Sequence, residues 1–167
     1  MPVHDLLASL VLGGAQTART KSPGLADYDK AGPYTFGVDM GMSARASQES
    51  EIRGFLWEHW QRRRLGSLTA TWISKEGAPN TYHYLIQPDE NGVWCVSIHV
   101  ERDLVQMGRS NQTHHEVEDY RAYTVERYEI PKGGNAPEVL IPGSGPRPPS
   151  SYELIFKDRH GKFVDGQ

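Results

Sequence analysis

The residues whose types and spacing could do chemistry are His83, His99 and Glu101. Imidazole nitrogens and a carboxylate oxygen are ligands that zinc and similar divalent metals accept, and a histidine can also act as a general base. Opposed residues on neighbouring strands have Cβ atoms about 4.5–5.5 Å apart, which is close enough for two imidazoles to share a metal. The alternative is an ordinary polar sheet face that requires no cofactor.

Three consecutive arginines, Arg62, Arg63 and Arg64, form the second candidate ligand-binding site. Their guanidinium groups could bind an anionic ligand or a nucleic-acid phosphate. In the alternative interpretation they only complement the negative end of a helix dipole. The net charge of −3 and the lack of a second basic stretch disfavour nucleic acid as a partner.

The remaining reactive residue types give weaker signals. His114 and His115 are adjacent and therefore point to opposite sides of an extended chain, so they are poorly placed to chelate one metal with Glu116. Cys95 has no basic partner at a suitable spacing, and neither CxxC nor HExxH occurs. The sequence therefore predicts no catalytic residue.

An amphipathic helix over 49–65 is the first element that must position these residues. Most of its apolar residues recur on one arc, and Arg62, Arg63 and Arg64 follow in its last turn. Ser47 is predicted as the N-cap and Gly66 as the left-handed residue that ends the helix. His59 lies within the apolar arc and is predicted to be a hydrogen-bonded core histidine.

Three strands over 67–74, 81–87 and 93–101 follow the helix, each with alternating apolar and polar residues. Asp89-Glu-Asn-Gly92-Val93 fits a three-residue loop with Gly92 in the left-handed position, which places His83 opposite His99. Pairing Trp72 with Tyr82 then puts Thr71 beside the two histidines as a further ligand-binding residue. The apolar face is expected to carry Trp72, Tyr84, Trp94, Val96 and Ile98.

The predicted fold class is α+β, with one amphipathic helix packed across a mainly antiparallel meander sheet of four to six strands. With 167 residues and one cysteine, the chain is expected to form a single domain without a disulfide framework. No stretch is apolar enough to predict a membrane span. The α+β core is predicted over 34–130, with a short strand at 34–38, a long loop at 103–119 and a strand at 120–130.

The two ends of the chain are predicted to lie outside this core. Residues 1–33 are interpreted as a leader and linker, in which Leu6–Ala15 resembles the apolar part of a signal peptide without its basic start. A signal-like segment would imply an extracytoplasmic location, and otherwise a cytoplasmic one is expected. Residues 131–151 form a Pro/Gly-rich connection, and 152–167 a C-terminal strand and hairpin turn.

Three functional hypotheses follow from these patterns. The leading one is a non-enzymatic interaction or structural module with an unknown protein or small-molecule partner. The second is a small-molecule or metal site on the His83/His99 face, with Glu101 as a third ligand and zinc or a similar divalent ion as the cofactor. The third is binding of an anion or nucleic acid through Arg62–Arg64.

Overall fold

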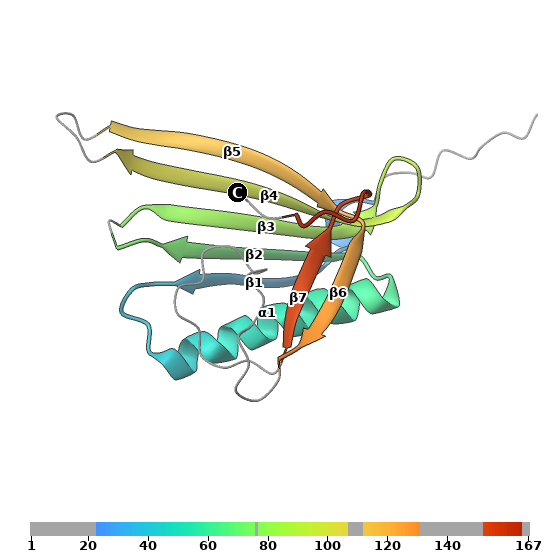
Figure 1. Cartoon of the computed structure of the whole chain (residues 1–167), viewed down its shortest axis with the longest axis horizontal. Coiled ribbons are helices and arrows are strands. Elements are labelled where there is room, and N and C mark those ends of the chain that lie inside the picture. Colours follow the sequence, from blue (N-terminus) through green and yellow to red (C-terminus); the bar gives the residue numbers. More distant parts are fainter. Residues whose placement is uncertain (1–22, 76, 107–111, 131–151, 165–167) are drawn as a thin grey trace, which may run out of the picture.

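The computed structural model describes residues 23–75, 77–106, 112–130 and 152–164. Within these ranges the chain forms one 3-10 helix, one α-helix and seven strands (Figure 1). In chain order they are η1 (Leu25–Asp27), β1 (Asp29–Phe36), α1 (Met42–Arg62), β2 (Gly66–Ile73), β3 (Pro79–Pro88), β4 (Trp94–Gln106), β5 (Gln112–Ala122), β6 (Thr124–Glu129) and β7 (Tyr152–Lys157).

Five of the strands form one sheet in the order β1-β2-β3-β4-β5. The pairs from β2 to β5 are antiparallel, whereas β1 runs parallel to β2 because α1 carries the chain back to the same end of the sheet. The sheet is therefore a βαβ unit followed by the predicted antiparallel meander, and only the parallel pairing of β1 with β2 is not predicted from the sequence pattern. The predicted linker up to residue 33 is also corrected, since β1 begins at Asp29.

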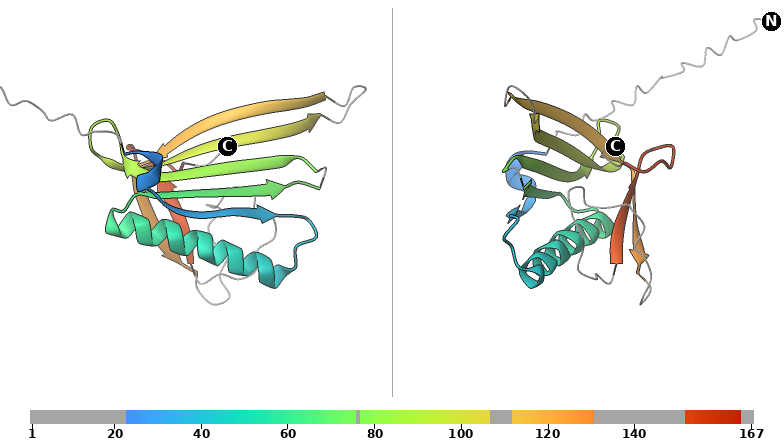
Figure 2. Two further views of the ribbon diagram at one scale, coloured as in Figure 1. Left: turned by 180° about the vertical axis from the view of Figure 1, so that it is seen from behind. Right: turned by 60° about the vertical axis from the view of Figure 1, so that its left-hand side comes forward.

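The second layer consists of α1 and the β6–β7 pair, which share one core with the inner face of the five-stranded sheet. β6 and β7 cross in front of the sheet in Figure 1 and behind it in the reverse view of Figure 2. These observations confirm the α+β fold. The buried core residues are Phe36, Ile52, Leu56, Trp60, Leu68, Ala70, Trp72, Tyr82, Tyr84, Ile86, Val96, Ile98, Val100, Ala122, Val125, Leu154 and Phe156.

The ends of α1 differ from the prediction. The helix begins two turns earlier, with Gly41 rather than Ser47 as the N-cap, since the intervening residues are mostly compatible with a helix. It ends at Arg62, and Arg63 adopts the left-handed conformation with φ of 50°. Gly66 instead belongs to β2, where an added Cβ would lie 3.1 Å from the His59 ring. Gly66 therefore allows a close approach of helix and strand.

Buried charge joins α1 to the second sheet. The Nη1 atom of Arg53 lies 3.9 Å from a carboxylate oxygen of Glu49 and 3.9 Å from one of Glu153 on β7. The Nε atom of Arg45 lies 3.1 Å from the other oxygen of Glu49. Because Glu49, Arg53 and Glu153 are almost fully buried, their charges are compensated inside the protein rather than by water.

The β3–β4 register agrees with the prediction. His83 lies opposite His99, Tyr84 opposite Ile98 and Ile86 opposite Val96. In the turn, the Asp89 N–H donates to the Val93 carbonyl over 2.8 Å, and Gly92 has φ of 78°. The three-residue loop therefore fixes which side chains share a face, as the sequence indicates.

The β2–β3 register corrects one predicted neighbour of the histidines. The first hairpin closes with the Ser74 N–H donating to the Ala78 carbonyl, so its turn begins earlier than predicted. Trp72 then pairs with Asn80 rather than Tyr82, a shift of two residues that leaves the same faces buried. Thr69, not Thr71, consequently lies opposite His83.

The predicted loop over 103–119 is also corrected. β4 continues to Gln106, and β5 begins at Gln112 and pairs with β4 along its whole length. The predicted strand over 120–130 is divided at Tyr123, whose N–H donates to the Lys157 carbonyl as the chain passes into the second sheet. β7, Tyr152–Lys157, is the strand predicted within 152–167.

Two predicted segments, Leu6–Ala15 and the connection over 131–151, lie outside the described residues. None of the helices in the described part of the chain is both long enough and apolar enough to span a lipid bilayer.

Candidate functional site on the outer face of the sheet

The candidate residues lie on the outer face of the five-stranded sheet, opposite α1, β6 and β7. Four side chains that lie directly opposite one another form a row across four strands: Thr69, His83, His99 and Asp119. We call these four residues the polar row. Thr71 lies outside it, opposite Thr81, and the hydroxyl oxygens of these two threonines are 3.0 Å apart. The face is therefore polar and internally hydrogen-bonded.

A hydrogen bond joins the two residues at each end of the polar row. At one end the Thr69 hydroxyl lies 3.0 Å from His83 Nδ1, and at the other His99 Nδ1 lies 2.7 Å from Asp119 Oδ1. Between the two imidazoles, Glu101 Oε1 lies 3.3 Å from His99 Nε2 and 4.0 Å from His83 Nε2. The two rings are 5.9 Å apart between centroids. Glu101 is thus hydrogen-bonded to His99 and lies within ion-pair distance of His83.

The carboxylates favour the protonated form of His99. Its two ring nitrogens face only acceptors, one on Asp119 and one on Glu101, and the imidazolium can donate to both. The hydrogen bond with Asp119, assisted by Glu101, raises the pKa of His99 above its usual value. Solvent moderates this effect because the His99 side chain is 40 % exposed.

This arrangement does not favour the predicted metal site of His83, His99 and Glu101. A metal ligand needs a free imidazole lone pair, whereas both nitrogens of His99 are directed at carboxylates. Among the residues that the structure describes, no group of three or more His, Cys, Asp or Glu side chains is arranged to hold a metal ion. Zinc binding therefore gains no support from the geometry.

A second histidine–carboxylate pair extends the polar face along β4 and β5. His115 lies opposite Asp103, with Nδ1 2.8 Å from Oδ1. His114 points to the other side of β5, where its Nε2 is 3.7 Å from Glu116. The adjacent histidines therefore do not act together.

The three arginines do not form one anion site. Arg62 lies 2.9 Å from Glu58, and Arg64 contacts Asp29. The guanidinium of Arg63 instead lies over the Trp60 ring, 4.0 Å from its centroid. His59, the predicted core histidine, is buried and bonded to the Phe55 carbonyl and Asp29. Two of the three arginines are thus already neutralised by carboxylates.

Cys95 lies at one end of the outer face but is fully buried. Its thiol donates to the Gln87 carbonyl over 3.5 Å, and the Tyr28 hydroxyl donates to the Gln87 side chain above it. Burial raises the pKa of the Cys95 thiol, which disfavours the nucleophilic thiolate. Cys95 is therefore a packing residue.

Three residues that bond to these histidines are not predicted from the sequence: Thr69, Asp103 and Asp119. Thr69 is missed because the first hairpin register is two residues off. Asp103 and Asp119 are missed because the stretch between them reads as a polar loop. The sequence does contain a pattern that could have identified β5 as a strand. Every second residue from 113 to 121 lies on the outer face: Thr113, His115, Val117, Asp119 and Arg121.

Comparisons with protein-family models, curated proteins and solved structures find no match to this chain.

Proposed function

We propose that the protein is a non-enzymatic interaction module that binds a basic protein segment on the outer face of its sheet. The surface is centred on His83, His99 and Glu101 and extends to Asp103 and Asp119 on the neighbouring part of β4 and β5. The single observation that carries the proposal is the pair of hydrogen bonds, Thr69–His83 and His99–Asp119, that orders the polar row on a solvent-exposed sheet face.

The fixed conformation of these side chains supports the proposal. Exposed histidine, threonine and carboxylate side chains ordinarily sample several rotamers, and fixing them on binding costs free energy. Here Thr69, Asp119 and Glu101 already hold the two imidazoles in place. A surface that is ordered before binding loses less conformational entropy when a partner docks.

The charge of the surface favours a basic partner. Glu101, Asp103 and Asp119 place three carboxylates along β4 and β5, and the Asp119 side chain is 78 % exposed. Arg121 on the same face is already paired with Glu90 over 2.9 Å. Even when His99 is protonated, this surface carries more carboxylates than unpaired positive charges. It should therefore attract a lysine or arginine side chain rather than repel it.

Fluorescence anisotropy with a dye-labelled nine-residue lysine peptide tests the proposal on the full chain. Glu101→Gln removes one charge from the centre of the surface and is expected to weaken binding about two- to fivefold, the range for an exposed ion pair. Glu126→Gln on β6 is the matched control, since the two side chains are 44 % and 47 % exposed. Added salt should weaken the wild-type complex.

The proposal is wrong if the two variants lose the same affinity, because the peptide would then sense only the overall net charge. It is equally wrong if neither the wild-type chain nor its variants bind the peptide at low ionic strength.

A further inference from the structure

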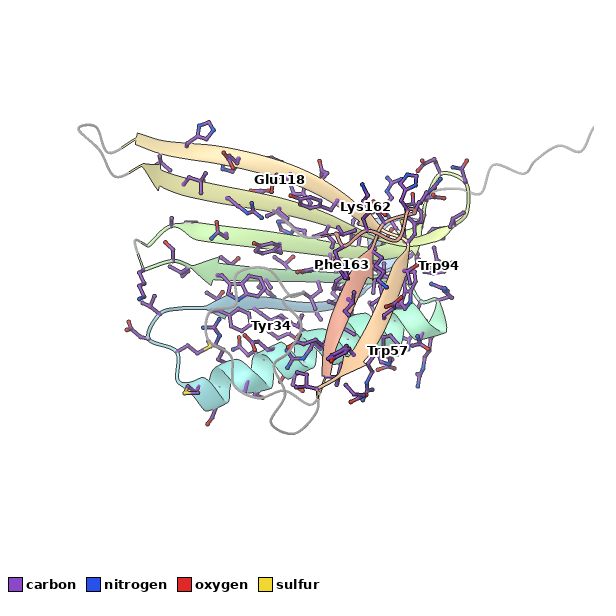
Figure 3. All side chains as sticks on the ribbon, viewed as in Figure 1. Tyr34, Trp57, Trp94, Glu118, Lys162 and Phe163 are labelled. Atoms are coloured by element: carbon purple, nitrogen blue, oxygen red, sulfur yellow. The ribbon has the colours of Figure 1, made fainter. Side chains whose placement is uncertain are left out.

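A pocket of about 870 Å³ opens at the end of the sheet that carries the β3–β4 turn. It lies between the β3–β4 turn and the chain that links α1 to β2, and Figure 3 shows Trp94 beside that turn. Its lining includes Arg63, Leu65, Pro88, Glu90, Trp94 and Arg121. The volume falls in the range of roughly 300–1,000 Å³ that is typical of small-molecule sites.

The carboxylates around the pocket are already paired with cations. Asp89 accepts the N–H groups of Asn91 and Val93 on one oxygen, and Tyr123 and Arg159 on the other. Glu90 pairs with Arg121 at 2.9 Å. These acidic side chains therefore contribute little uncompensated negative charge to the pocket.

Arg63 supplies a positive charge that no carboxylate of the described residues neutralises. Its position is set by the backbone, because it is the left-handed C-cap of α1 and its N–H bonds back to the last turn of the helix. The guanidinium stacks on Trp60 at 4.0 Å, which restricts the side chain, although Arg63 as a residue is exposed. Arg63 is thus a fixed cation at the wall of the pocket.

Leu65, Pro88 and Trp94 supply the apolar part of the wall, and Trp94 is half-buried. We propose that the pocket binds a small aromatic monoanion, with its carboxylate paired to Arg63 and its ring against this apolar wall. The proposal goes beyond the interaction module, because it concerns a different site and a different class of ligand.

Calorimetric titration of the full chain with 1-naphthoate tests the proposal, with 1-naphthylmethanol as the uncharged analogue of similar shape. Naphthoate should bind more tightly than the alcohol and should shift the indole N–H resonance of Trp94. Arg63→Gln should weaken naphthoate binding about tenfold, as expected for loss of a charge-assisted hydrogen bond, and should leave the alcohol unaffected. Arg63→Lys, which keeps the positive charge, should lose less affinity for naphthoate than Arg63→Gln.

Arg62→Gln is the matched control, since Arg62 is the neighbouring arginine but pairs with Glu58 and does not line the pocket. It should bind naphthoate like the wild type. The inference is overturned if naphthoate fails to bind at millimolar concentration, if both arginine variants lose affinity equally, or if the alcohol binds as tightly as the anion. None of these outcomes depends on the lysine-peptide experiment.

Discussion

His99 Nδ1 lies 2.7 Å from Asp119 Oδ1, its direct partner across β4 and β5. The hydrogen bond with Asp119, helped by the nearby Glu101 carboxylate, raises the pKa of His99. Since the folded-state pKa is above the usual value of about 6.5, the stabilisation is fully present below that pH. It is lost as the pH rises through the folded-state pKa.

Asp119→Asn should lower the pKa of His99 toward its ordinary value, because the amide retains an acceptor but loses the negative charge. The stability of the variant should also vary less with pH near neutrality. NMR titration of the His99 ring measures the first effect. Asp103→Asn is the control, since Asp103 bonds to His115 instead, and it should leave the His99 titration in place. An unchanged His99 pKa in Asp119→Asn would contradict this reading.

Asp89 and Asp158 begin turns of the same type, and each accepts two backbone N–H groups through Oδ1. Only Asp89 also accepts Tyr123 and Arg159 on Oδ2, at 3.1 and 2.5 Å. We therefore expect Asp89→Asn to destabilise the protein more than Asp158→Asn at pH 7, because its amide group would face two donors. Urea denaturation compares the two variants, and equal losses would show that the Oδ2 contacts add nothing.

Asp89 should also make the stability of the protein depend on pH in the acidic range. Burial raises the pKa of Asp89, but the hydrogen bonds from Val93, Asn91 and Tyr123, together with Arg159, lower it overall. This stabilisation is present above the unfolded-state pKa and is lost as the pH falls through the lower folded-state pKa. The stability of Asp89→Asn should accordingly fall less steeply than that of the wild type at acidic pH, as denaturation at several pH values would record.

Arg53→Ala should destabilise the protein by about 3–5 kcal/mol, the cost of leaving buried carboxylates without their cation. The variant keeps Glu49 and Glu153 between α1 and β7, where both are almost fully buried. Arg62→Ala on the same helix removes an exposed partner of Glu58 and should change the free energy of unfolding by no more than about 0.5 kcal/mol. Similar urea midpoints for the two variants would mean that the buried charges are solvated.

The parts of the fold that can be predicted from the sequence are those determined by neighbouring residues in the chain. The loop from Asp89 to Val93 contains Gly92 at the position that needs positive φ, so the β3–β4 register and the His83–His99 pair can be deduced from it. Alternation in the same strands identifies the buried face. Both signals act over a few residues, which is why they can be read without knowing the rest of the structure.

The missed features depend on contacts between distant segments. Parallel pairing of β1 with β2 follows from how α1 packs, and no residue of β1 encodes it locally. Asp119 joins the polar row only because β5 pairs with β4, yet the polar composition of that stretch suggests a loop. Arg53 is buried because Glu153, 100 positions further along the chain, compensates its charge.

Chemical-shift mapping tests directly whether the outer face of the sheet is the binding surface. The ¹⁵N-labelled full chain would be titrated with the nine-residue lysine peptide at low ionic strength. We predict that amide shifts concentrate around His83, His99, Glu101 and Asp119, and that Glu101→Gln reduces them while Glu126→Gln does not. Shifts centred on α1 or on β6 and β7, or spread evenly over all acidic residues, would contradict this prediction.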